Sequence, residues 1–140
     1  MRFTLSLALL PLFAFPAGAQ ECPVSQLKAA QEAIAKAPSC DAGIAVFESC
    51  GSKASSYNNL GTLAMTAQAR CEKDFLDALH GDKRRLYKSR QYSCYRKAVN
   101  GSSALFYFPK NFCGPYLAQH YLHALAKFKQ EQITNPNPPL

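Results

Sequence analysis

The chain is 140 residues long, with 48% hydrophobic residues, six cysteines and no tryptophan. This length suits one small domain with a modest core, and no apolar stretch reaches the roughly 20 residues that a membrane-spanning helix needs. The formal net charge is +7 at pH 7, which favours anionic partners over cationic ones.

The first 19 residues have the pattern of a secretory signal peptide. Arg2 supplies a positive charge, Leu5–Phe15 form a short apolar run, and Ala17-Gly18-Ala19 match a small-residue cleavage site. We therefore predict an exported protein, periplasmic or secreted, whose mature chain begins at Gln20. Without Arg2, 15 basic residues remain against 9 acidic ones, a net charge of +6.

All six cysteines lie in the predicted mature part, at positions 22, 40, 50, 71, 94 and 113. An even number of cysteines in a short exported chain is typical of a disulfide framework. Metal binding is the alternative, but the sequence contains no C-x-x-C pair. We predict three disulfides, no metal site and no cofactor, with each disulfide contributing about 2–4 kcal/mol to stability.

Helical spacing predicts two helices at the start of the mature chain. The first lies within residues 22–38. Its apolar stripe is Leu27, Ala30, Ile34 and Ala37. The second covers residues 41–51, with Asp41 as its expected cap and Gly51 at its end. Residues 51–61, GSKASSYNNLG, are polar and predict a loop.

A third helix is predicted to follow this loop and to end near Leu79. Its expected buried face is Leu60, Ala64, Ala67, Cys71, Phe75 and Leu79. Gly81 is expected to end this third helix. Asp82 is the expected cap of a fourth helix, which ends near residues 100–103.

The last part of the chain predicts one extended segment, one helix and a tail. Residues 104–109, ALFYFP, are strand-like, and we expect them to lie across the bundle because a lone strand has no partner. Gly114 and Pro115 open a fifth helix to about residue 131. Its expected inward residues are Leu117, Tyr121, Ala124, Leu125 and Phe128. Residues 134–140 are proline-rich and predict a disordered tail.

The predicted fold class is therefore all-α, with about five helices in a single disulfide-stapled domain over residues 20–133. Helix geometry limits the disulfide pairs, because cysteines at opposite ends of one helix are too far apart to bond. An antiparallel hairpin of the first two helices favours Cys22–Cys50. Cys94–Cys113 would then bracket the extended segment and leave Cys40–Cys71. Cys71–Cys94, across the turn at Gly81, remains a rival pair.

The fourth helix contains a basic stretch, DKRRLYKSRQYSCYRK, over residues 82–97. Seven of its sixteen residues are Lys or Arg, and a helical projection places a positive stripe with two tyrosines on one side. The stripe consists of Arg84, Arg85, Lys88, Tyr92, Tyr95 and Arg96. The opposite side, expected to anchor the helix to the core, consists of Leu86, Tyr87, Cys94 and Ala98.

Three interpretations of this stripe are open. It is a solvated face, partly neutralised by Glu72, Asp74 and Asp77 on the preceding helix. Alternatively, it is a contact surface for an anionic lipid, glycolipid or wall polymer, because clustered charge attracts anions without demanding much specificity. Nucleic acid is the least favoured partner: tyrosines and arginines suit base stacking, but an exported protein does not routinely meet nucleic acid.

Candidates for catalysis are few. His120 and His123 stand three residues apart on the fifth helix, but no third metal ligand is evident, so we expect hydrogen-bonded, partly buried histidines instead. Glu72, Asp74 and Asp77 could supply paired carboxylates, yet they are expected on one exposed helical stretch beside basic neighbours. An enzyme is therefore the third hypothesis for the chain.

Several motifs resemble those of a known group of proteins. They are CEKDFL from residue 71, CYRK from residue 94, and NFC ending at residue 113, followed by a helix rich in tyrosine and alanine. Over about residues 70–125 the chain resembles small uncharacterised exported cysteine-rich helical proteins of Gram-negative bacteria, some of them grouped with lysozyme-inhibitor-type envelope proteins. The resemblance implies a periplasmic location and a non-catalytic role.

We therefore predict an exported, non-enzymatic binding or structural module whose basic helix contacts an anionic envelope component. The alternative is a protein-partner module such as a lysozyme inhibitor, with contacts at residues 55–61 or 104–108.

Overall fold

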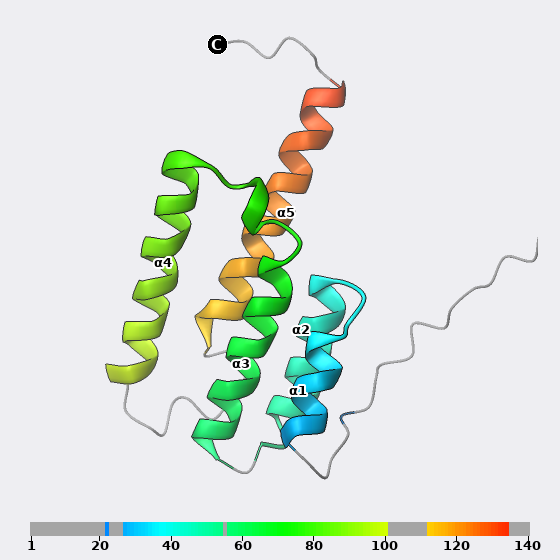
Figure 1. Ribbon diagram of the computed structural model, residues 1–140, viewed down its shortest axis with the longest axis vertical. Helices are drawn as coiled ribbons and strands as arrows, with labels where there is room; N and C mark the ends of the chain where they lie inside the picture. Colours follow the sequence, from blue (N-terminus) through cyan, green and yellow to red (C-terminus); the bar gives the residue numbers. More distant parts are fainter. Residues whose placement is uncertain (1–21, 23–26, 55, 101–111, 135–140) are drawn as a thin grey trace, which may run out of the picture.

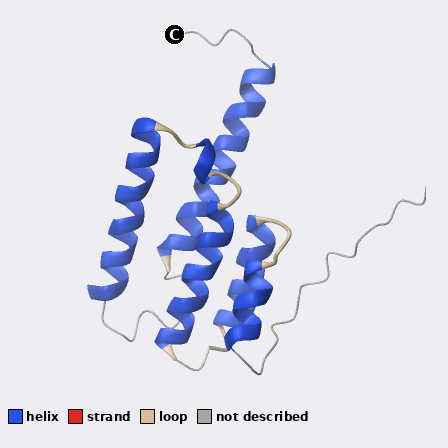
Figure 2. Ribbon diagram, viewed as in Figure 1, coloured by secondary structure: helices blue, strands red, loops and turns tan. Residues whose placement is uncertain are grey.

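The computed structural model describes residues 22, 27–54, 56–100 and 112–134. Within these ranges the chain is a small all-α bundle, and none of the described residues forms a strand (Figures 1 and 2). The elements, in chain order, are α1 (Leu27–Ala35), α2 (Cys40–Gly51), α3 (Tyr57–Glu72), the 3-10 helix η1 (Leu76–Ala78), α4 (Gly81–Asn100) and α5 (Cys113–Thr134). The predicted fold class is confirmed.

Helix α3 is the centre of the bundle. It packs against α1, α2 and α5, whereas α4 packs chiefly against α5 and stands at one side of the molecule (Figure 1). The predicted apolar face of α3 is buried, and it continues through Phe75 and Leu79, both 2% exposed. Apolar side chains of α1 and α2, including Ile34 and Phe47, close the other side of this core.

Two helices begin at serine caps that the sequence pattern did not single out. Ser39, not Asp41, is the N-cap of α2, because its hydroxyl accepts a hydrogen bond from the Ala42 amide. Ser56 caps α3 in the same way, by accepting from the Asn59 amide. The predicted polar loop is therefore shorter than expected, since its last residues form the first turn of α3.

The predicted third helix is also divided. Helix α3 ends at Glu72, and the chain continues through turns and η1 before it reaches α4. Gly81 starts α4 with a φ of +52°, in the left-handed region that favours glycine. The predicted break at Gly81 is thus where the backbone changes direction.

Helix α5 is buried mainly in its first half, where Pro115 and Ala118 lie in the core. Tyr121 and Leu125 are partly buried, as expected of inward residues. Ala124 is exposed and Phe128 is 48% exposed, so the prediction that they face inward is wrong. Only the last turns of α5 extend beyond the other helices (Figure 1), and Phe128 still contacts α4 through Lys83.

Three disulfides link the elements, and all three predicted pairs are confirmed. Cys22–Cys50 joins the segment before α1 to α2, Cys40–Cys71 joins α2 to α3, and Cys94–Cys113 joins α4 to α5. Their Cα atoms lie 4.9, 4.3 and 5.5 Å apart. The rival pair Cys71–Cys94 is excluded because both cysteines have other partners.

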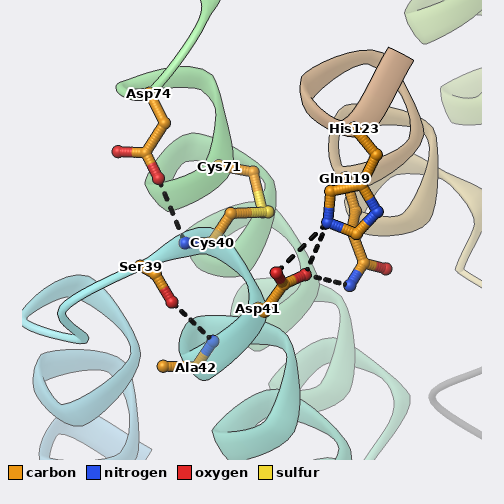
Figure 3. Close-up of polar contacts among 8 residues, drawn as sticks. All are labelled: Ser39, Cys40, Asp41, Ala42, Cys71, Asp74, Gln119 and His123. Atoms are coloured by element: carbon orange, nitrogen blue, oxygen red, sulfur yellow. Dashed lines mark hydrogen bonds and ion pairs between the residues drawn. A yellow bond between two sulfur atoms is a disulfide. The ribbon is translucent and has the colours of Figure 1, made fainter. Parts of the chain in front are cut away.

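A buried arginine strengthens the junction between α2 and α3. Arg70 is 8% exposed; its Nε donates to the Ala37 carbonyl at 2.7 Å, and its guanidinium pairs with Asp74 at 2.7 Å. Asp74 also accepts a hydrogen bond from the Cys40 amide, beside the Cys40–Cys71 disulfide (Figure 3). Asp74 therefore stabilises the start of α2. The expectation that it neutralises the basic residues of the fourth helix is wrong.

Three predicted segments lie outside the described residues: the signal peptide over residues 1–19, the apolar segment at 104–109, and most of the tail, since α5 ends at Thr134. Among the helices that the structure describes, none is long and apolar enough to cross a membrane.

Candidate functional site

The predicted positive stripe lies along α4. Every one of its six side chains is exposed, and Tyr92 and Tyr95 are each 62% exposed despite their aromatic rings. Helix α4 can present this face because it is anchored from its other side and stands beside the bundle (Figure 1). Exposed aromatic rings between cations are suited to contact a surface that is both charged and apolar.

Few of the cations on α4 are neutralised. Arg85 pairs with Asp82 on the same helix. In the part of the chain that the structure describes, no acidic side chain forms an ion pair with Arg84, Lys88 or Arg96. Lys88 instead donates to the Gln91 side chain at 3.0 Å. The stripe therefore retains most of its positive charge.

Two of the three acids that were expected to neutralise the stripe, Glu72 and Asp74, have other partners. Glu72 is partly buried, and its Oε1 accepts hydrogen bonds from Tyr87 at 2.6 Å, Gln68 at 2.8 Å and Gln91 at 2.9 Å. Asp77 is exposed in η1. The expectation that Glu72 lies on an exposed face and pairs with basic residues is thus wrong, because three uncharged donors surround it.

Tyr87 anchors α4 to the bundle. It is 0% exposed, and its ring meets those of Phe75 and Tyr121 edge-on, with centroids 5.2 and 4.9 Å away. Burial and the neighbouring Glu72 carboxylate raise the pKa of Tyr87 well above that of a free tyrosine, so its hydroxyl stays protonated and donates. Leu86 was predicted to share this anchoring role, but it is 50% exposed.

Two further cations on α4 lie over aromatic rings of α5. Arg90 is 5.9 Å from the centre of the Tyr121 ring, and Lys83 is 5.1 Å from that of Phe128. These contacts hold cations on the side of α4 that faces α5. They add to the packing between the two helices without cancelling charge.

A groove of about 900 Å³ separates the exposed part of α4 from α3. Its floor includes Gly61, Met65 and Ala69, which follow one another at four-residue intervals along α3. Its α4 wall includes Lys88, Gln91, Tyr92, Cys94 and Tyr95, and residues 112–115 close one end. Two tyrosines and one lysine of the predicted stripe therefore belong to the wall of a largely apolar groove.

No sequence pattern predicts this groove directly. A faint indication was the small residues Gly61 and Ala69 at helical spacing around Met65, which were not assigned to any function. Such a spacing shows that one face of a helix carries small side chains. It does not show which helix packs opposite that face or how far away that helix lies.

The histidines of α5 have separate surroundings. Both are exposed, so the expectation that they are partly buried is wrong. His123 lies 3.0 Å from Asp41, whose carboxylate also accepts from Gln119 at 2.6 Å (Figure 3). The Gln119 hydrogen bond and the neighbouring His123 lower the pKa of Asp41. Within the described residues, no three potential ligands come together as a metal site.

Comparison with known proteins identifies no relatives. The chain matches no protein-family model, and neither the curated proteins nor the solved structures contain a significant match. Function can therefore be inferred only from the residues and geometry of this chain.

Proposed function

We propose that the protein is an exported, non-enzymatic binding module whose helix α4 contacts an anionic component of the cell envelope, such as an anionic lipid, glycolipid or wall polymer. The observation that carries this proposal is the unneutralised stripe on α4. Arg84, Lys88 and Arg96 are exposed, and the nearest expected acids are engaged elsewhere.

Export is supported by the leader pattern and by the disulfides. Three disulfides use all six cysteines of the chain. Disulfides of this kind persist in oxidising compartments such as the periplasm or the extracellular space. An anionic envelope surface is present in those compartments, so the proposed partner and location agree.

The physical basis of binding is electrostatic attraction supported by aromatic contact. A basic residue near an anionic membrane surface contributes about 1 kcal/mol, and the attraction falls off within a Debye length. Tyr92 and Tyr95 lie between the cations and can enter the interface between water and an apolar phase. Such binding should be salt-sensitive and only moderately specific.

The test is binding of the oxidised protein, beginning at residue 20, to vesicles. We expect binding to vesicles of phosphatidylglycerol and phosphatidylcholine but not to pure phosphatidylcholine. We also expect it to weaken as sodium chloride is raised to 1 M, where the Debye length is about 3 Å. Reversing three charges, with Arg84→Glu, Lys88→Glu and Arg96→Glu, should weaken binding at low salt by about a hundredfold or more.

A matched control changes net charge equally but away from α4. It carries Lys28→Glu, Lys53→Glu and Lys129→Glu, three exposed positions on other parts of the chain. If this control loses as much binding as the α4 variant, net charge alone is responsible and the proposed site is wrong. Vesicle binding that persists in 1 M salt would show that apolar contact and not charge drives it, and would contradict the proposed role of the cations.

A further inference from the structure

The groove between α3 and α4 contains half of the large exposed apolar and aromatic side chains among the described residues. Six large apolar or aromatic side chains stand out as exposed among the described residues, and Met65, Tyr92 and Tyr95 are three of them. Met65 is 64% exposed. An exposed apolar patch with a polar rim usually marks a place where another molecule binds.

Helix α4 is attached to the rest of the bundle beside the groove. Tyr87 and Gln91 hydrogen-bond to Glu72, and Cys94, less than one turn after Gln91, is bonded to Cys113. On the floor of the groove, α3 presents the small residues Gly61 and Ala69 on either side of Met65. At Gly61 an added Cβ would stand 3.8 Å from the Phe112 ring, an ordinary contact, so the structure does not require glycine here.

The groove has a cationic mouth. Lys88 lines it, and Arg84 lies one helical turn earlier on the same side of α4. Glu72 also lines the groove, but Tyr87, Gln68 and Gln91 donate to its carboxylate. The exposed cations therefore favour an anionic group at the mouth, while the floor and the tyrosine wall favour an apolar chain.

We infer that this groove binds the acyl chain of a single-chain anionic lipid, with the headgroup held by Lys88 and Arg84. The volume of about 900 Å³ lies within the roughly 300–1,000 Å³ of typical small-molecule sites. The inference rests on the proposed function and deepens it. Helix α4 would recognise the headgroup by charge, and the groove would take up the hydrocarbon.

A tryptophan reporter tests the inference, because the chain has no tryptophan of its own. Tyr95→Trp places the reporter on the groove wall, and Ile133→Trp places a control at an 81% exposed position near the end of α5. Dodecanoate, kept below its micelle concentration, should shift the emission of the first reporter to the blue and saturate. Acetate, the same headgroup without the chain, should leave both reporters unchanged.

Charge specificity is tested with a cation that carries the same chain. Dodecyltrimethylammonium should bind the groove reporter more weakly than dodecanoate, by about tenfold or more for the loss of favourable charge contacts. Equal binding of the two amphiphiles, or an equal response of the control reporter, would overturn the inference.

A groove-filling variant separates shape from charge. In the Tyr95→Trp background, Gly61→Leu with Ala69→Leu narrows the floor while keeping it apolar and helical. It should weaken dodecanoate binding by about tenfold, because some methylene groups would no longer be buried. Gly61→Ala is the matched control and should bind as before. Unfolding curves and far-ultraviolet circular dichroism establish that each variant is folded.

The results also distinguish this inference from the proposed function. If anionic vesicles bind through the α4 cations but dodecanoate does not bind, the inference fails and the proposed function stands. If the groove reporter is already blue-shifted and does not respond, as expected were residues 104–108 to fill the groove, the inference also fails. If the unmodified protein does not bind anionic vesicles, the proposed function itself is overturned.

Discussion

At the scale of single residues, the most informative contact joins Tyr87 to Glu72. The tyrosine is fully buried and its hydroxyl donates to the carboxylate at 2.6 Å. Gln68 and Gln91 complete the surroundings of the same oxygen. Because uncharged donors satisfy this acid, it is not available to neutralise the cations on α4. One buried contact thus explains both how α4 is anchored and why its outer face remains positive.

Replacing Tyr87 should reveal the strength of this anchor. Tyr87→Phe keeps the ring packing but removes the donor, so the free energy of unfolding should fall by about 1–3 kcal/mol at neutral pH. Denaturant unfolding measures the loss. Tyr95→Phe, at an exposed position, should change stability by less than about 0.5 kcal/mol. Equal effects of the two variants would contradict the role assigned to the contact.

The pKa of Tyr87 gives this prediction a pH dependence. Its folded pKa lies above the ordinary value of 10.0, so the stabilisation is fully present below pH 10 and decreases as the pH rises above it. The difference between wild type and Tyr87→Phe should therefore be constant at neutral pH and become smaller in alkaline solution. A difference that grows above pH 10 would mean that the tyrosine ionises more easily in the folded state.

For single residues, the sequence predicted which side chains are buried better than which groups they hydrogen-bond to. Helical spacing correctly marked the apolar face of α3, since burial along a helix follows from its period. It did not find that Ser39 rather than Asp41 caps α2, because both residues suit an N-terminus and the choice depends on where the backbone turns. It also could not pair Arg70 with the Ala37 carbonyl, because the segment between α1 and α2 meets α3 only in the folded bundle.

At the scale of elements, α4 differs from the other helices. It packs chiefly against α5 and is tied to that helix by the Cys94–Cys113 disulfide. The other two disulfides staple α2, which packs on α1 and α3. We therefore expect the part of the bundle formed by α1, α2 and α3 to stay folded when α4 opens.

Removing the disulfide of α4 tests this division. Cys94→Ser with Cys113→Ser should cost up to about 2–4 kcal/mol and speed amide hydrogen exchange in α4 by about tenfold or more, with little change in α3. Mass spectrometry or NMR can follow the exchange. The matched control, Cys22→Ser with Cys50→Ser, should leave exchange in α4 unchanged. Equal acceleration in α3 and α4 would show that the bundle opens as one unit.

The boundaries of the elements show what sequence patterns can and cannot predict. The break at Gly81 was predicted, because glycine acts locally, but Asp82 lies inside α4 and does not cap it. The division of the third helix after Glu72 was missed, because Phe75 and Leu79 continue the buried pattern although the chain there is no longer α-helical. A buried apolar pattern usually continues only as far as its helix does, but here the pattern continues beyond the end of α3.

At the scale of the whole molecule, charge and packing are unevenly distributed. Seven of the 16 basic residues lie between residues 82 and 97, on helix α4, which packs chiefly against α5. The three disulfide pairs could be predicted in part, because helix lengths exclude Cys22–Cys40 and Cys40–Cys50, but the rival pair Cys71–Cys94 could be excluded only in the folded bundle. The groove could not be predicted, because its width depends on how α3 and α4 are held apart in space. The sequence therefore predicts the framework and the charged helix, but not the cavity beside that helix.

If α4 is the surface that contacts an anionic envelope component, NMR should map the contact to this helix. Short-chain phosphatidylglycerol, kept below its micelle concentration, would be titrated into the labelled, oxidised protein. Short-chain phosphatidylcholine, which is zwitterionic and has no net charge, is the control. We expect the largest amide shifts between Arg84 and Arg96, and much smaller shifts with phosphatidylcholine. Shifts confined to α1 and α2, or equal shifts with both lipids, would contradict the claim.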